Sequence, residues 1–160
     1  MRSKIIVIGA STTGKSTLIR SLKEKISLPL FEMDEELKKL NGGIFPSDFD
    51  QKMHLSALVI SNILERSEVV FLTNTNYFTK DDLLLAQEKG FFVVQLVLPR
   101  EEMEKRNRNR VENEGYDDLS RHFENMIHYQ EEIQKDNLVD SVIETNNSME
   151  NIEKEFLALV

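Results

Sequence analysis

Apolar residues along the chain follow two patterns, short unbroken runs and longer stretches with helical spacing. The short runs are rich in β-branched and aromatic residues, which predicts strands. They cover residues 4–8, 27–33, 68–72, 91–98 and 138–145. The run at 91–98, FFVVQLVL, is apolar at nearly every position, as expected for a strand covered on both faces of a parallel sheet.

Between these runs, apolar residues recur every three or four positions, which predicts amphipathic helices. The predicted helices cover residues 13–25, 34–40, 48–66, 79–89, 100–113, 119–135 and 146–160. Thr79 and Asp82 form a plausible capping box, and Gly90 ends the helix that they begin. Because strands alternate with helices throughout, we expect a three-layer α/β/α fold with a five-stranded, parallel sheet. Ligands of such sheets bind beyond the carboxyl ends of the strands.

Composition narrows the class of protein. The chain has 160 residues and no linker or repeat, so we expect a single domain, 1–160. It contains no cysteine, which excludes disulfides and thiolate sites, and only three histidines. The formal net charge of −8 argues against binding nucleic acid by charge alone. The longest apolar run is too short to span a bilayer and the first residues make a poor signal peptide, so we expect a cytoplasmic protein without a membrane partner.

The segment GASTTGKS, residues 9–16, carries the most specific chemistry. It fits the pattern G-x-x-x-x-G-K-[ST] and has a predicted strand before it and a predicted helix after it. Glycines let the backbone approach an anion closely, and successive N–H groups at a helix N-terminus stabilise phosphate. Lys15 would reach the β- and γ-phosphates, and the Ser16 hydroxyl would bind Mg²⁺. The alternative is a flexible turn that happens to carry a lysine.

From this loop, the residues that we expect to bind the nucleotide are Gly9, Ser11, Thr12, Thr13, Gly14, Lys15, Ser16 and Thr17. The chain has no N/T-K-x-D segment after a strand, which is the usual guanine-reading motif, and it is short for a motor or ring ATPase. ATP with Mg²⁺ is therefore the expected cofactor pair.

Three further stretches resemble the small P-loop kinases, the group of adenylate, shikimate and gluconate kinases, and most of all their polynucleotide-kinase-like branch. They are FEMDEEL at 31–37, FLTNTNYFTKDDL at 71–83 and LVLPREEMEKRNRNR at 96–110. The resemblance implies a P-loop NTPase fold of the nucleoside-monophosphate-kinase type, with a small helical lid at about 100–118.

The resemblance also implies roles for residues near the second and third strands. Asp34 would accept the proton of the attacking hydroxyl, although an aspartate here also suits a helix N-cap. The TNTN segment, 73–76, begins with Thr73 where the resembled branch has an aspartate that helps to hold Mg²⁺. Asn74 and Asn76 could hydrogen-bond the substrate, or simply form a turn.

The arginine-rich segment is the candidate lid. Arg106 and Arg110 are four residues apart and share one helix face, so they could close on the triphosphate, with residues 111–118 as the flexible part. The alternative is a solvated helix with the ion pairs Glu101–Lys105 and Glu102–Arg106. The resemblance places Asn146 beside the adenine, although the NNS sequence at 146–148 also suits a turn and helix cap.

These residues favour an ATP-dependent phosphotransferase that transfers the γ-phosphate to a hydroxyl of a small molecule, nucleoside or nucleotide. Lys15, Asp34, Arg106 and Arg110 are the expected catalytic residues, and Ser16 is the expected metal ligand. Two alternatives stay open: a polynucleotide 5′-hydroxyl kinase, and a nucleotide-binding switch or weak ATPase. The acceptor side, 34–64, is acidic and apolar, which disfavours nucleic acid without excluding it. The oligomeric state is not predicted.

Overall fold

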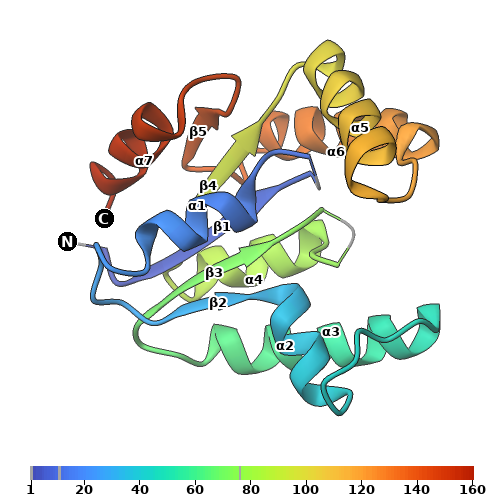
Figure 1. The fold of residues 1–160 in the computed structure, drawn as a ribbon. Helices are drawn as coiled ribbons and strands as arrows, with labels where there is room; N and C mark the ends of the chain where they lie inside the picture. The colour runs from blue at the N-terminus through green and yellow to red at the C-terminus, as the bar shows by residue number, and fades with distance from the viewer. Residues whose placement is uncertain (1, 11, 76) are drawn as a thin grey trace.

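A five-stranded parallel sheet lies at the centre of the molecule (Figure 1). The computed structural model describes residues 2–10, 12–75 and 77–160. The strands are β1 (Lys4–Gly9), β2 (Leu30–Glu32), β3 (Val69–Thr73), β4 (Phe92–Val97) and β5 (Ser141–Glu144), in the order β2-β3-β1-β4-β5. In this register Ile6 lies between Phe71 of β3 and Val93 of β4. The predicted parallel α/β sheet is confirmed.

Helices cover both faces of the sheet. They are α1 (Lys15–Leu22), α2 (Met33–Leu40), α3 (Phe49–Leu64), α4 (Lys80–Glu88), α5 (Arg100–Glu114), α6 (Phe123–Lys135) and α7 (Met149–Leu157), with a short 3-10 helix, η1, at Ser120–His122. Helices α1 and α7 pack on one face, whereas α3, α4 and α6 contribute to the core on the other. Helix α5 projects beyond the carboxyl end of the sheet (Figure 1).

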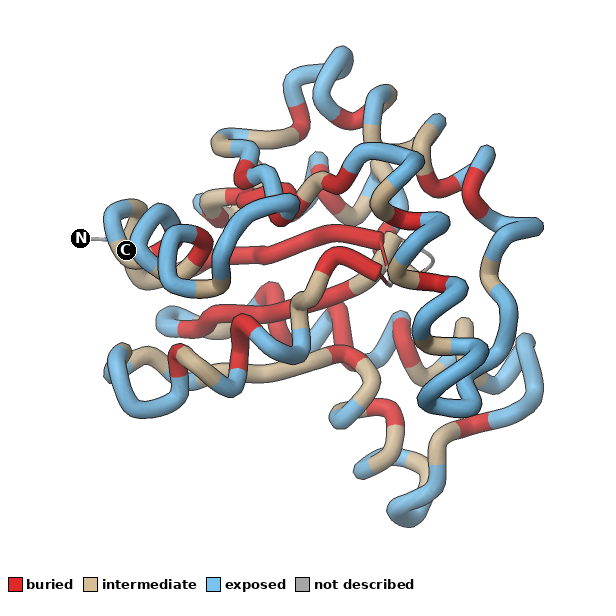
Figure 2. Tube along the Cα trace, turned by 45° about the horizontal axis from the view of Figure 1, so that its top comes forward, coloured by how far each residue is buried: buried red, intermediate tan, exposed pale blue. Residues whose placement is uncertain are grey.

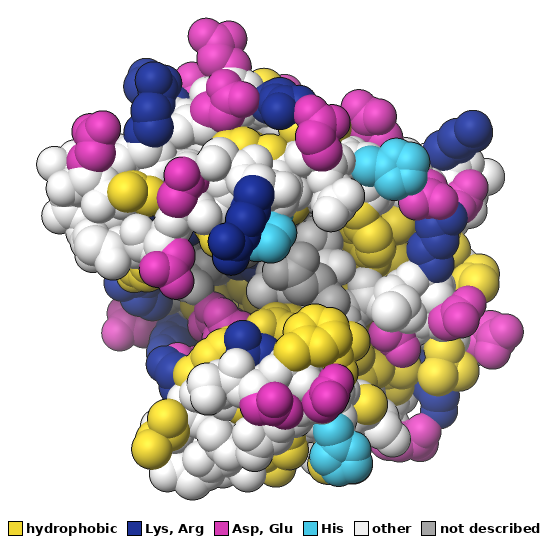
Figure 3. All heavy atoms as spheres, turned by 90° about the vertical axis from the view of Figure 1, so that its right-hand side faces the viewer, with side chains coloured by type: hydrophobic (Ala, Val, Ile, Leu, Met, Phe, Trp, Pro, Cys, Tyr) yellow, Lys and Arg dark blue, Asp and Glu magenta, His cyan; other side chains and the backbone are white. Residues whose placement is uncertain are grey.

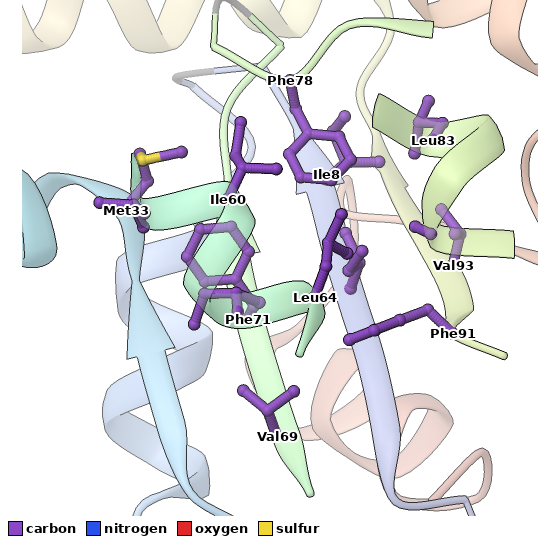
Figure 4. Packing of buried hydrophobic residues seen from close by; sticks show 14 of the residues in the cluster. Ile8, Met33, Ile60, Leu64, Val69, Phe71, Phe78, Leu83, Phe91 and Val93 are labelled. Carbon is purple, nitrogen blue, oxygen red and sulfur yellow. The ribbon is translucent and has the colours of Figure 1, made fainter. Parts of the chain in front are cut away.

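Burial follows this layered arrangement. The strands form a continuous buried centre, and the outer sides of the helices are exposed (Figure 2). On the α3–α4 face, Phe71 of β3 lies close to Ile60 and Leu64 of α3, and Leu83 of α4 lies near Val93 of β4 (Figure 4). The alternating contacts of the strands with both helical layers explain why their sequences are apolar at successive positions.

Local signals set several element boundaries. The predicted capping box forms, since the Thr79 N–H donates to Asp82 Oδ2 at 2.9 Å and the Asp82 N–H to Thr79 Oγ1 at 3.3 Å. Ser148 caps α7 by accepting from the Asn151 N–H at 3.2 Å. Helix α1 begins at Lys15 rather than at residue 13, because the Thr13 N–H bonds to the Ala10 carbonyl at 3.1 Å within the loop. No helix in the described ranges has the length and apolar character that crossing a bilayer requires.

Phe71 tests the core on the α3–α4 side. Its side chain is fully buried, and its ring centroid lies 6.5 Å from that of Phe78. We expect Phe71→Ala to lower the free energy of unfolding by about 3–5 kcal/mol in urea titrations, because it removes buried area and leaves a cavity. Leu84→Ala on the half-exposed side of α4 is the control and should cost about 1 kcal/mol or less. Equal losses for both variants would contradict this description of the core.

Candidate active site at the carboxyl end of the sheet

The loop between β1 and α1 begins with a close contact that only glycine permits. A Cβ on Gly9 would lie 2.7 Å from Thr13 Oγ1 and 3.0 Å from the Leu96 carbonyl oxygen. The Thr13 hydroxyl in turn donates to the Ala10 carbonyl at 2.7 Å. The loop is therefore folded tightly back on itself. Ser11, one of the residues predicted to bind nucleotide, lies outside the described residues.

Gly14 directs the chain from this loop into α1. Its φ of 83° and ψ of 24° lie in the left-handed region, which favours glycine. Helix α1 has no side-chain cap, so its first N–H groups remain available to an anion. Nearby, the buried Thr12 hydroxyl has no hydrogen-bond partner in the described structure, and Thr17 is exposed on the first turn of α1.

Lys15 folds back over the loop. Its Nζ donates to the Gly9 carbonyl at 2.7 Å and to the Ala10 carbonyl at 2.8 Å. Burial is the main reason that its pKa falls to about 8; the charges of Asp34 and Glu32 oppose this fall, and that of Arg110 adds to it. A cation is thus held partly desolvated at the base of a loop with unpaired helix N–H groups, an arrangement suited to phosphate.

Ser16 and Glu32 meet beside Lys15. The Ser16 hydroxyl donates to Glu32 Oε1 at 2.6 Å, which links the first turn of α1 to the end of β2. Glu32 is a residue that the sequence analysis missed. The available signal was the spacing of Glu32 and Asp34, two carboxylates on alternate positions where a predicted strand ends.

Asp34 lies in the first turn of α2, whose N-cap is Glu32, so the N-cap interpretation of Asp34 is wrong. Burial and the charge of Glu32 raise its pKa, whereas the charges of Lys15 and Lys38 lower it. Burial raises the pKa of Tyr77 as well, and the Asp34 charge adds to this rise. Asp34 is therefore close enough to both Lys15 and Tyr77 to interact with them electrostatically.

The TNTN segment supplies no carboxylate to this site. Thr73 is buried at the end of β3, and its hydroxyl donates to the Asn74 carbonyl at 3.2 Å. Asn74 is half-buried, and Asn76 lies outside the described residues. The nearest carboxylate to Ser16 comes instead from Glu32 on the neighbouring strand β2.

Arg106 of α5 joins two loops at the edge of the site. Its guanidinium donates to the Thr12 carbonyl at 3.0 Å and to the Thr145 carbonyl, between β5 and α7, at 2.8 Å. Neither Glu101–Lys105 nor Glu102–Arg106, all within the described part of the chain, forms an ion pair. Asn146 follows Thr145 and is exposed, so it lies next to the carbonyl that Arg106 contacts.

Arg110 lies one helical turn further along α5. Its guanidinium carbon is 4.2 Å from the centroid of the Tyr116 ring, and its charge reaches Lys15. Arg108 is exposed on another side of the helix. The structure therefore brings Arg106 and Arg110 together on the loop side of α5, as their spacing predicts.

Asn107 fixes the segment that follows α5. This buried side chain donates to Asp118 Oδ1 at 2.8 Å and accepts from the Leu119 N–H at 3.0 Å. Asp118 Oδ1 also accepts from the Ser120 N–H at 2.9 Å, and these hydrogen bonds lower the pKa of Asp118. The far end of the segment 111–118 is thus tied to α5; lid motion stays a prediction.

These groups border one hollow. Seen toward the carboxyl end of the sheet, it lies between the part of the molecule that carries α5 and α6 and the part that carries α2 and α3 (Figure 3). Within the described ranges, no cluster of three or more His, Cys, Asp or Glu side chains could hold a metal by itself. A metal here would depend on fewer protein ligands together with those of a bound phosphate.

Comparison with known proteins agrees with this geometry. No protein-family model matches the chain. A segment of 86 residues is 28% identical to the shikimate kinase of Aquifex aeolicus (strain VF5); the match covers 51% of this chain and 51% of that kinase, so it spans about half the length of the curated relative.

Solved structures match over nearly the whole chain. The shikimate kinase of Aquifex aeolicus has a TM-score of 0.75 at 23% identity, over 98% of this chain and 94% of that one. A shikimate kinase from Acinetobacter baumannii in complex with shikimate gives 0.73 at 18% (98% and 92%), and a gluconokinase from Sinorhizobium meliloti 1021 gives 0.66 at 19% (98% and 90%). The chain has the fold of the small P-loop kinases, and the predicted resemblance to this class is confirmed. The narrower resemblance to the polynucleotide-kinase-like branch stays a prediction.

The lowered pKa of Lys15 makes a prediction about anion binding. In the free protein this lysine is charged at pH 7 and mostly neutral at pH 9, whereas the terminal phosphate of ATP ionises at about pH 6. We expect the dissociation constant for ATP to rise about tenfold between pH 7 and pH 9, measured by calorimetry, because only the charged amine attracts phosphate.

Lys15→Met is the control for this titration. It should bind ATP weakly at both pH values, with little change between them. A wild-type affinity that is independent of pH, or the same slope in both proteins, would contradict the assignment of this titration to Lys15.

Proposed function

We propose that the protein is an ATP-dependent phosphotransferase that moves the γ-phosphate of ATP to a hydroxyl of a small molecule. One observation carries the proposal: the ammonium group of Lys15 and the carboxyl group of Asp34, on different elements, interact electrostatically at the carboxyl end of the sheet. Phosphoryl transfer needs a cation on the phosphates and an oriented acceptor hydroxyl in line with them, and these two residues would meet both needs.

The phosphates would occupy the space above the first turn of α1. Its N–H groups and the Lys15 ammonium would hold the β- and γ-phosphates once Lys15 exchanges the Gly9 and Ala10 carbonyls for phosphate oxygens. Arg110 and Arg106 would add positive charge from α5, where a planar guanidinium suits the spread charge of a transferring phosphoryl group. The preference for ATP over GTP rests on the absence of a guanine-reading motif and on the resemblance.

Ser16 and Glu32 are the residues that would hold Mg²⁺. Their oxygen atoms lie 2.6 Å apart, and a hydroxyl, a carboxylate and phosphate oxygens are the ligands that this ion prefers. The ion would neutralise charge on the phosphates. Glu32 answers the difficulty that Thr73 raises, because it provides a carboxylate from β2 where β3 provides none.

Asp34 would orient the acceptor. Its raised pKa makes the carboxylate a stronger base than an exposed aspartate, and the charge of Lys15 nevertheless favours its ionised form. The acceptor hydroxyl would give its proton to this carboxylate while its oxygen bonds to the γ-phosphorus and ADP leaves. The fold shared with shikimate kinases and a gluconokinase supports a small acceptor of this kind.

Asp34→Asn tests the proposal. With labelled ATP, Mg²⁺ and a mixture of small hydroxyl compounds, we expect the wild type to label an acceptor and the variant to be slower by about 10²–10⁴-fold, because the base is lost. The dissociation constant for ATP should change less than about threefold, because Asp34 lies on the acceptor side. Glu35→Gln, on the next and exposed residue of α2, should keep the wild-type rate.

Two results would oppose this function. Tight ATP binding without transfer to any acceptor would favour the nucleotide-binding switch, which the threonine at position 73 makes the second candidate. Transfer that survives in Asp34→Asn at the wild-type rate would leave phosphotransfer in place and remove Asp34 from it.

A further inference from the structure

The acceptor side of the hollow carries an excess of negative charge. The chain from Glu32 to Arg66, which includes α2 and α3, has seven acidic residues against four lysines and arginines. Two of these acids, Glu32 and Glu35, act directly on Asp34, since both raise its pKa. An anionic group brought close to Asp34 would therefore meet like charges in a partly desolvated place, where their repulsion is weakly screened.

The cations of this side are largely engaged. Lys38 Nζ lies 3.3 Å from Glu35 Oε1, and Lys39 Nζ lies 3.0 Å from Glu36 Oε1. The guanidinium of Arg66 lies 4.2 Å from the centroid of the Phe31 ring, away from Asp34 on the far end of α3. Lys52 lies over the ring of Phe45, with Nζ 5.3 Å from its centroid, and is the one cation here that could still reach an acceptor anion.

The same region offers apolar and aromatic surface. Tyr77, which interacts with Asp34, packs together with Phe45 against the buried cluster of the α3–α4 face. Ile44 is 72% exposed and Phe49 is 70% exposed, and both flank the loop between α2 and α3. Hydrophobic side chains gather on the α2–α3 side of the hollow (Figure 3). Such surface suits the apolar face of a sugar ring or a nucleobase.

We infer that the acceptor is an uncharged hydroxyl compound with an apolar face, such as a nucleoside or a neutral polyol, and not a carboxylic acid or a nucleotide. This rests on the proposed phosphotransferase function and names its substrate class. It separates the chain from its structural neighbours named for shikimate and gluconate, whose acceptors carry a carboxylate.

Matched pairs of acceptors test this inference. Each pair keeps the hydroxyl groups near the transfer site and changes one charge: glucitol and gluconate, methyl shikimate and shikimate, thymidine and thymidine 3′-monophosphate. We expect kcat/KM with MgATP to be about tenfold or more higher for the neutral member of the pair that serves as substrate, because the anion must approach Glu32 and Glu35.

Charge variants on α2 separate electrostatics from shape. Glu35→Lys should narrow the difference within a pair by about tenfold, through a lower KM for the anionic member. Glu36→Lys adds the same charge on the same helix at a residue without effect on the Asp34 pKa, so it should leave the ratio nearly unchanged. Lys52→Gln should not reduce transfer to any acceptor by more than about threefold.

The outcomes are distinguishable. A neutral preference below tenfold, faster transfer to an anionic member, or loss of that transfer in Lys52→Gln would overturn the inference and leave the phosphotransferase function standing. Absence of transfer to every member, with ATP binding intact, would overturn the proposed function and this inference with it.

Discussion

The position of the Lys15 ammonium group is the constraint on which the rest of the site depends. It lies on the carbonyls of Gly9 and Ala10, inside a loop that is held closed by the Thr13 hydroxyl and by the lack of a Cβ on Gly9. Burial makes the charged form costly, and the carboxylates of Asp34 and Glu32 offset that cost. Because one cation connects the loop to the end of β2, phosphate and acceptor functions are linked through it.

Much of the fold could be predicted because its signals are local. Unbroken apolar runs mark strands buried on both faces, and the Thr79–Asp82 capping box and Ser148 fix helix starts through contacts three residues apart. The glycine-rich loop is equally local, since its conformation follows from positions 9–16. Element ends were less certain: the second strand shortens to Leu30–Glu32, because hydrogen bonding to β3 and not apolar character sets its limits.

The contacts between distant segments could not be predicted in the same way. Glu32 and Ser16 are sixteen residues apart, and only the order of the strands brings the end of β2 next to α1. Arg106 was expected to face phosphate, yet its hydrogen bonds go to carbonyls at Thr12 and Thr145, which gives it a bridging position as well. Asn107 looked like a spacer between arginines, whereas it is buried and ties the segment after α5 to that helix.

The account is tested most directly by amide chemical shifts recorded while MgATP is added to the ¹⁵N-labelled protein. If the loop and the start of α1 hold the triphosphate, the largest changes should fall on the N–H groups of Gly14, Lys15 and Ser16, with little change at Lys89 and Gly90 near the opposite end of the sheet. Saturating MgATP that leaves the loop resonances unmoved, or that moves the two ends equally, would contradict the central claim.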